Sequence, residues 1–117
     1  MIDERRIGSR ITCTLPVRLY PQDTMLVIQT LTRDLGVRGL RVVTPHPIPD
    51  NAPISIELRL EPGDDLLTLV GQAIWHQPIP NSEQFQQGIS FHAPSEYLTR
   101  RLSGYIRHTQ DRSLQII

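Results

Sequence analysis

An all-β fold that ends in one helix is predicted by three observations on the sequence. Short segments with alternating or β-branched apolar residues recur between residues 12 and 91. Turns that contain proline or glycine separate these segments, and no crossover helix interrupts them. A helical spacing of apolar residues occurs near the C-terminal end. We therefore expect about six antiparallel strands in a barrel or a sandwich, with the helix packed on it.

The first half of the chain contains three of the expected strands. The first covers residues 12–20 and includes Pro16, which is typical of an edge strand or an irregular start. The second covers residues 24–32, which are rich in β-branched and apolar side chains, and it runs into residues 34–39, which we expect to form a tight loop. The third covers residues 40–44 and ends at a proline-rich segment, because proline cannot donate to a sheet.

The second half contains the other three strands. Residues 54–60 alternate strictly between apolar and polar side chains, which is the clearest pattern of a half-buried strand in the chain. A long strand follows at residues 66–76, in which Gly71 predicts a bulge or a sharp bend. Residues 84–91 form the last expected strand.

The last expected element is an amphipathic helix. Apolar residues recur at positions 98, 102, 105 and 106, which places them on one face. A polar arm precedes the first strand, and 117 residues suit one domain with one core. We therefore expect a single domain over residues 1–117, with the arm at 1–10, the β-structure at 11–92 and the helix at 94–112.

Composition excludes several classes of function. The formal net charge is zero, which argues against general binding to nucleic acid polymers or anionic lipid. The chain has one cysteine and four histidines without ligand spacing, so we expect no disulfide, metal or cofactor. The sequence contains no long apolar run, secretory leader, nucleophile–base pair or phosphate loop. We therefore expect a cytoplasmic protein that is neither inserted in a membrane nor an enzyme.

The basic residues are all arginine, and they are unevenly distributed. Residues 46–96 carry seven acidic residues against one arginine, whereas arginine exceeds the acidic residues on both sides of this segment. The planar fork of arginine fits phosphate or the O6/N7 edge of guanine better than the point charge of lysine does. The alternative explanation for the exclusive use of arginine is a codon bias.

Two segments carry the most informative polar residues. Arg6 and Arg10 lie in the glycine-containing arm, so both guanidinium groups can converge on one anion. In the expected loop, Asp34 can accept the N1 and N2 hydrogens of a guanine, and backbone N–H groups near Gly36 and Gly39 can approach a phosphate. Together these groups fit a ligand that contains phosphate and guanine.

These two segments resemble the motifs of the PilZ family, bacterial receptors of cyclic dimeric GMP (c-di-GMP). The family's RxxxR motif matches Arg6 and Arg10, and Arg5 precedes them. The [D/N]xSxxG motif matches the segment from Asp34 to Gly39, although Gly36 occupies the serine position. Residues 71–75 and 88–91 are similar to the family's closing strands. The resemblance therefore covers nearly the whole chain.

The resemblance implies a six-stranded antiparallel barrel with a C-terminal helix and an arm that folds over the bound ligand. It implies that Arg6 and Arg10 grip phosphate and the guanine Hoogsteen edge, and that Asp34 binds the Watson–Crick edge. Arg5 and Arg38 are expected as auxiliary cations. The implied function is a sensor that couples c-di-GMP, bound singly or as a stacked pair, to an effector protein or fused domain in motility, biofilm or exopolysaccharide control.

Two alternatives remain open at this point. A PilZ-like adaptor that binds no nucleotide and acts through protein contacts is favoured by the missing serine at Gly36, whereas the retained Arg6, Arg10 and Asp34 argue against it. Trp75 is expected in the core, since a tryptophan in a strand is more often buried, and the alternative is that it lines the ligand surface.

Overall fold

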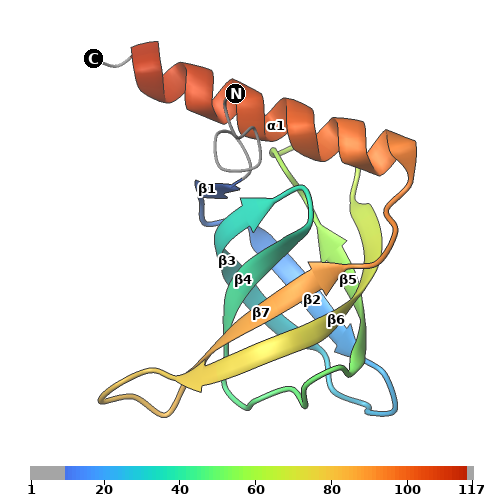
Figure 1. Ribbon diagram of the computed structural model, residues 1–117, viewed down its shortest axis with the longest axis vertical. Coiled ribbons are helices and arrows are strands. Elements are labelled where there is room, and N and C mark those ends of the chain that lie inside the picture. Colours follow the sequence, from blue (N-terminus) through green and yellow to red (C-terminus); the bar gives the residue numbers. More distant parts are fainter. Residues whose placement is uncertain (1–9, 116–117) are drawn as a thin grey trace, which may run out of the picture.

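A computed structural model describes residues 10–115 of the chain, which form one β-structure with a helix across one end (Figure 1). The elements are β1 (Arg10–Thr12), β2 (Pro16–Pro21), β3 (Ile28–Gly36), β4 (Gly39–Thr44), β5 (Pro53–Leu58), β6 (Leu67–Pro78), β7 (Phe85–Phe91) and α1 (Glu96–Gln115).

Strands β2 to β7 form a closed antiparallel barrel. Their order is β3-β2-β5-β6-β7-β4, and an additional pairing of β3 with β4 closes the sheet on itself. The three-residue strand β1 is added beside the end of β3, where Arg10 pairs with Gly36. The predicted six-stranded barrel with one C-terminal helix is therefore confirmed, and closure of the sheet excludes the sandwich.

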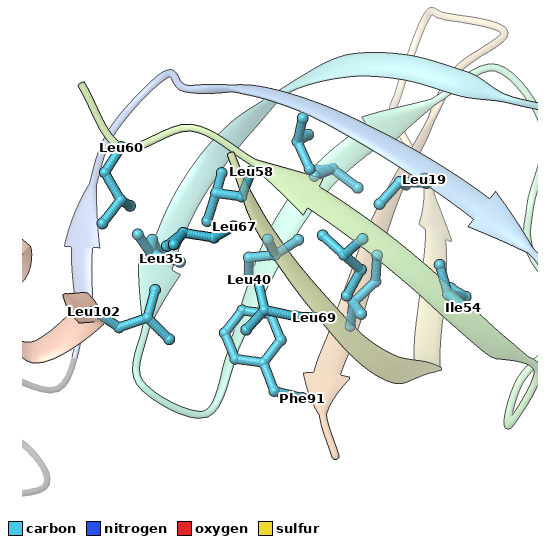
Figure 2. Close-up of a cluster of buried hydrophobic side chains, with 14 of the residues drawn as sticks. Leu19, Leu35, Leu40, Ile54, Leu58, Leu60, Leu67, Leu69, Phe91 and Leu102 are labelled. Atoms are coloured by element: carbon cyan, nitrogen blue, oxygen red, sulfur yellow. The ribbon is translucent and has the colours of Figure 1, made fainter. Parts of the chain in front are cut away.

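The core lies inside the barrel, where inward-facing side chains of all six strands meet (Figure 2). In β5 the alternation predicted from the sequence is present, because Ile54, Ile56 and Leu58 are buried and Ser55 is exposed. Leu19 of β2 and Phe91 of β7 join the same cluster. Each such buried side chain contributes roughly 1.5–3 kcal/mol relative to an exposed one, so this cluster supplies the main stabilisation of the barrel.

Helix α1 lies over one end of the barrel (Figure 1). The helix begins after Ser95, whose Oγ accepts a hydrogen bond from the Leu98 backbone N–H at 3.1 Å and so caps the first turn. Leu102 and Ile106, on the predicted apolar face, are buried against the barrel. Arg101 of the helix also forms an ion pair with Asp64 of the β5–β6 loop at 3.2 Å.

The predicted positions of the first strands are wrong in detail. Strand β3 begins at Ile28 rather than at residue 24, and it continues through Asp34 to Gly36, where a loop was expected. The reason is pairing: β2 pairs with β3 between Pro16 and Leu19, and β1 then pairs with the rest of β3. The expected strand at residues 12–20 is correspondingly divided between β1 and β2.

The expected role of Gly71 is also wrong. Gly71 pairs regularly with Ile54 and Phe91, whereas the irregularity of β6 lies between Ala73 and Trp75. A Cβ atom added at Gly71 would lie 2.2 Å from the carbonyl oxygen of Ser90. The sequence could not separate these roles, because a bulge and a close approach of two backbones both favour glycine.

We predict that Gly71→Ala destabilises the barrel by about 1–3 kcal/mol, because the added methyl group must displace backbone atoms. Gly104→Ala is the matched control. A Cβ at Gly104 meets no atom within 4 Å, and alanine should stabilise the helix by up to about 1 kcal/mol. Urea denaturation of both variants measures the two effects. Equal stability of Gly71→Ala and the wild type would contradict the close-approach interpretation.

Candidate functional site

One residue of each motif found in the sequence, Arg10 of the first and Asp34 of the second, lines a cavity on the outer surface of the barrel. This cavity has a volume of about 330 Å³, and β1, β3, β4, β6 and β7 contribute to it. Its lining residues are Arg10, Asp34, Leu40, Arg41, Ile74, Trp75, Gly88 and Ile89.

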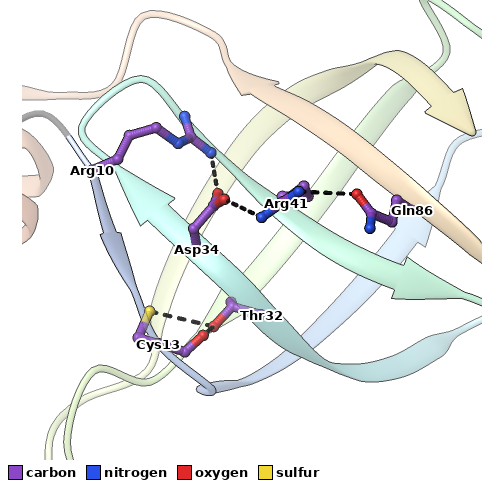
Figure 3. Close-up of polar contacts among 6 residues, drawn as sticks. All are labelled: Arg10, Cys13, Thr32, Asp34, Arg41 and Gln86. Atoms are coloured by element: carbon purple, nitrogen blue, oxygen red, sulfur yellow. Dashed lines mark hydrogen bonds and ion pairs between the residues drawn. The ribbon is translucent and has the colours of Figure 1, made fainter. Parts of the chain in front are cut away.

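Asp34 lies between two arginines in this cavity (Figure 3). Arg10 Nη2 forms an ion pair with Asp34 Oδ1, and Arg41 Nη2 lies 2.9 Å from Asp34 Oδ2. Arg41 is held at a second point, because its Nη1 donates to Gln86 Oε1 at 3.0 Å. The Asp34 side chain is 17% exposed, so both of its oxygens are engaged in a partly desolvated place. Charge-assisted hydrogen bonds of this kind are stronger than neutral ones.

Sheet register brings these three side chains together. Asp34 pairs directly with Arg41 across β3 and β4, and it pairs with Thr12 across β3 and β1. Arg10 is therefore a diagonal neighbour of Asp34, within reach of a long side chain. A register shift between Thr32 and Asp34 adds a local irregularity, which is typical of strands that re-aim a side chain.

Other expected site residues have different environments. Gly36 is buried in β3, opposite Arg10. Gly39 is required for packing, because a Cβ there would lie 2.2 Å from the carbonyl oxygen of Ile89. Arg38 is exposed in the turn, where its carbonyl oxygen accepts a hydrogen bond from Phe91 N at 2.8 Å, and it does not line the cavity. Arg5 and Arg6 lie outside the described residues.

Trp75 lies on the outer surface of the barrel, so its expected place in the core is wrong. Its side chain is 37% exposed and lies against Gly88, where an added Cβ would be 2.3 Å from Trp75 Nε1. The irregularity between Ala73 and Trp75 breaks the alternation of β6, and as a result both Ile74 and Trp75 are exposed. The indole thus adds an aromatic surface to the cavity.

Arg41 is the residue of this cavity that the sequence reasoning missed. A signal for it exists: Val37 and Arg38 form a two-residue turn between β3 and β4. Such a turn fixes the register of a hairpin, so that Leu35 pairs with Leu40 and Asp34 with Arg41. Because residues 34–39 were expected to form a loop, no pairing between Asp34 and Arg41 was predicted.

Cys13 is packed beside the site and does not line it. The hydroxyl of Thr32 donates to the Cys13 carbonyl oxygen at 2.7 Å and accepts from Leu15 N at 2.8 Å, which ties β3 to the segment after β1. Burial raises the pKa of the Cys13 thiol, and a hydrogen bond with Thr32 partly offsets this. The thiol is therefore protonated and weakly nucleophilic at neutral pH.

No group of three or more histidine, cysteine, aspartate or glutamate residues within residues 10–115 could hold a metal ion. In the same part of the chain, no helix combines the length and apolar character needed to cross a bilayer.

Comparisons with solved structures identify the fold. The inhibitor of motility MotI/DgrA from Bacillus subtilis has a TM-score of 0.77 and 18% identity, over 89% of this chain and 50% of that protein. The PilZ domain of YcgR from Escherichia coli, solved with c-di-GMP, has a TM-score of 0.67 and 14% identity, over 91% of both chains. The PilZ domain of CeSA from a cellulose-synthesizing bacterium has a TM-score of 0.64 and 22% identity, over 85% of this chain and 98% of that one.

The chain spans about half the length of MotI/DgrA, so it corresponds to one part of that protein. No curated protein matches the sequence. A model of the PilZ domain family matches residues 4–108, which is most of the chain and includes both arginine and aspartate motifs. This match and the shared barrel agree with the resemblance seen in the sequence. The chain belongs to the PilZ domain family.

Proposed function

We propose that this chain is a c-di-GMP-binding sensor that couples the level of the second messenger to a protein partner. The observation that carries the proposal is the cavity in which Arg10, Asp34, Arg41 and Trp75 meet. It combines cations for phosphate, a carboxylate for guanine and an aromatic surface for a base. Two similar structures, the PilZ domain of YcgR and the protein PlzA from Borreliella burgdorferi, were solved with c-di-GMP. MotI/DgrA, an inhibitor of motility, supports a role in motility control.

Binding in this cavity requires an exchange of partners at Asp34. The guanine N1–H and N2–H groups need the carboxylate oxygens that Arg10 and Arg41 engage in the free protein. The Arg10 side chain is 48% exposed and belongs to a three-residue strand, whereas Arg41 is 36% exposed and is also held by Gln86. Arg10 is therefore the group that turns to the ligand, whereas Arg41 stays on Asp34 Oδ2, which can accept a second hydrogen bond from the base.

The remaining groups complete the proposed site around this exchange. The Trp75 indole gives a face on which a guanine base can stack. Arg5 and Arg6, with Arg10, form the arm that closes over the phosphates, and Arg38 in the adjacent turn is an auxiliary cation. The backbone near Gly36 and Gly39 completes the ligand-binding set.

A second candidate function is an adaptor that binds partners without nucleotide. Gly36 favours it, because the hydroxyl of the family motif is missing at this position. The engaged state of Asp34 also favours it, since a ligand must displace an existing ion pair. Isothermal calorimetry with c-di-GMP separates the two functions: saturable binding supports the sensor, and the absence of binding supports the adaptor.

We predict that Arg10→Ala and Arg6→Ala each weaken c-di-GMP binding by about 1.5–3 kcal/mol, or roughly ten- to hundred-fold, because each removes charge-assisted hydrogen bonds. The control is Arg18→Ala, which removes an exposed arginine from β2, outside this cavity. Calorimetry gives the affinities, and fluorescence of Trp75, the single tryptophan, reports occupancy of the cavity. If Arg10→Ala binds c-di-GMP with wild-type affinity and has unchanged thermal stability, the arm does not contribute to the binding site.

We predict that Gly36→Ser tightens binding by about 0.5–1.5 kcal/mol, the net value of one added hydrogen bond. The competing effect would be backbone strain, but Gly36 lies in a strand and is not among the described glycines with positive φ. Calorimetric affinities of the variant and the wild type give the result, and a melting curve detects any loss of stability. An equally stable variant that binds no tighter would show that position 36 does not face the ligand.

A further inference from the structure

The β2–β3 and β4–β5 loops lie at the end of the barrel opposite α1 (Figure 1). Residues of these loops line an apolar groove. It has a volume of about 430 Å³, within the range of roughly 300–1,000 Å³ that is usual for ligand sites. The β2–β3 loop forms one wall and the β4–β5 loop forms the other. The side chains that line it include Leu26, Val27 and Ile28 from the first wall and Pro45, Pro47 and Pro49 from the second. These residues differ from those of the Asp34 cavity.

The β2–β3 loop exposes three consecutive apolar side chains: Leu26 and Val27 line the groove, and Met25 precedes them in the chain without lining it. Met25 is 98% exposed, Leu26 is 58% exposed and Val27 is 50% exposed. They lie just before β3 and contribute no side chain to the core. A contiguous apolar surface of this kind is unfavourable in water and is typical of an interaction site.

Hydrogen bonds and prolines hold both walls in place. In the first wall, Thr24 Oγ1 donates to the carbonyl oxygen of Pro21 at 3.1 Å and accepts from Leu26 N at 3.2 Å. In the second wall, Thr44 Oγ1 donates to the carbonyl oxygen of His46 at 2.8 Å. The alternating prolines of this wall fix their own φ angles. A preformed groove loses little conformational entropy when a partner binds.

The second wall is also anchored to the barrel by a buried amide. Gln87 Oε1 accepts a hydrogen bond from Ile48 N at 2.9 Å, and Gln87 Nε2 donates to the carbonyl oxygen of Trp75 at 2.6 Å. Ile48 and Gln87 are both buried. One side chain therefore joins the groove to the strand that carries Trp75.

The charges near the groove identify the partner's chemistry. Residues 19–32 contain no arginine, and residues 42–58 contain none either. The two loops instead carry Asp23 and Asp50, both exposed, and Asp50 Oδ1 also lies 3.2 Å from Nδ1 of His76 in β6. Anionic lipid and nucleic acid are repelled by such a surface, and a cationic partner is attracted.

We propose that this groove docks a segment of a partner protein in which apolar side chains are flanked by basic residues, as on a cationic amphipathic helix. The apolar face of such a segment fills the groove and covers Met25 and Leu26. Its basic residues lie near Asp23 and Asp50. Insertion of an amphipathic helix into an apolar groove is a common mode of peptide recognition.

The test is a titration of the full chain in the absence of nucleotide, in which the backbone amide chemical shifts of the protein are monitored by NMR. Two synthetic peptides of about 18 residues are used, each with leucine at helical spacing on one face. The other face carries lysine in one peptide and glutamate in the second. We expect the lysine peptide to shift the backbone amides of residues 24–29, 46 and 48, and the glutamate peptide to leave them unchanged.

A double variant, Met25→Ser with Leu26→Ser, should weaken binding of the lysine peptide about ten-fold or more while preserving the fold, because both side chains lie outside the core. The matched control is Leu31→Ser, which removes a 51% exposed leucine from β3 away from the groove and should leave the affinity unchanged.

Three results with the peptides would overturn the proposal: no shifts with the lysine peptide up to about 1 mM, equal binding of both peptides, or undiminished binding by the double variant. Shifts of the groove amides with anionic phospholipid vesicles would also overturn it in favour of a membrane surface. All of these titrations are performed without c-di-GMP. A failure of this chain to bind nucleotide would therefore contradict the proposed sensor function but not the proposed role of the groove.

Discussion

The antiparallel pairing of β3 with β4 is the constraint on which the rest of this structure depends. The two-residue turn at Val37 and Arg38 sets its register, and the pairing closes the sheet into a barrel. Closure buries Leu35 and Leu40 in the core. The same register places Asp34 opposite Arg41, so the hairpin that completes the fold also builds the candidate site.

Three glycines allow neighbouring atoms to pack closely against the backbone, because glycine has no Cβ atom. At Gly39 and Gly71, carbonyl oxygens of β7 occupy the positions that Cβ atoms would take. At Gly88 the indole of Trp75 occupies that position and is thereby held on the outer face. The cavity beside Asp34 thus depends on close backbone packing as much as on its charged residues, because a methyl group at any of these positions would separate the elements that line it.

The barrel carries two surfaces of opposite chemistry. The cavity near β1 presents arginines and an aromatic ring, whereas the groove at the other end is apolar and is bordered by aspartates. Gln87 bonds to the backbone behind each surface, at Trp75 and at Ile48. The buried amide of Gln87 therefore satisfies one backbone group on the side of each surface.

The sequence by itself determined the fold class, the helix and the two motifs, because these depend on local alternation, helical periodicity and residue spacing. Strict alternation in β5 and the apolar stripe of α1 were sufficient for this purpose. Only the tertiary structure decided that Asp34 lies in a strand, that Arg41 is its partner, that Trp75 is outside the core and that Met25 is exposed. The physical reason is register: a side chain's face and neighbours depend on which residues pair across strands and where an irregularity breaks the alternation, and these are set by contacts between distant segments.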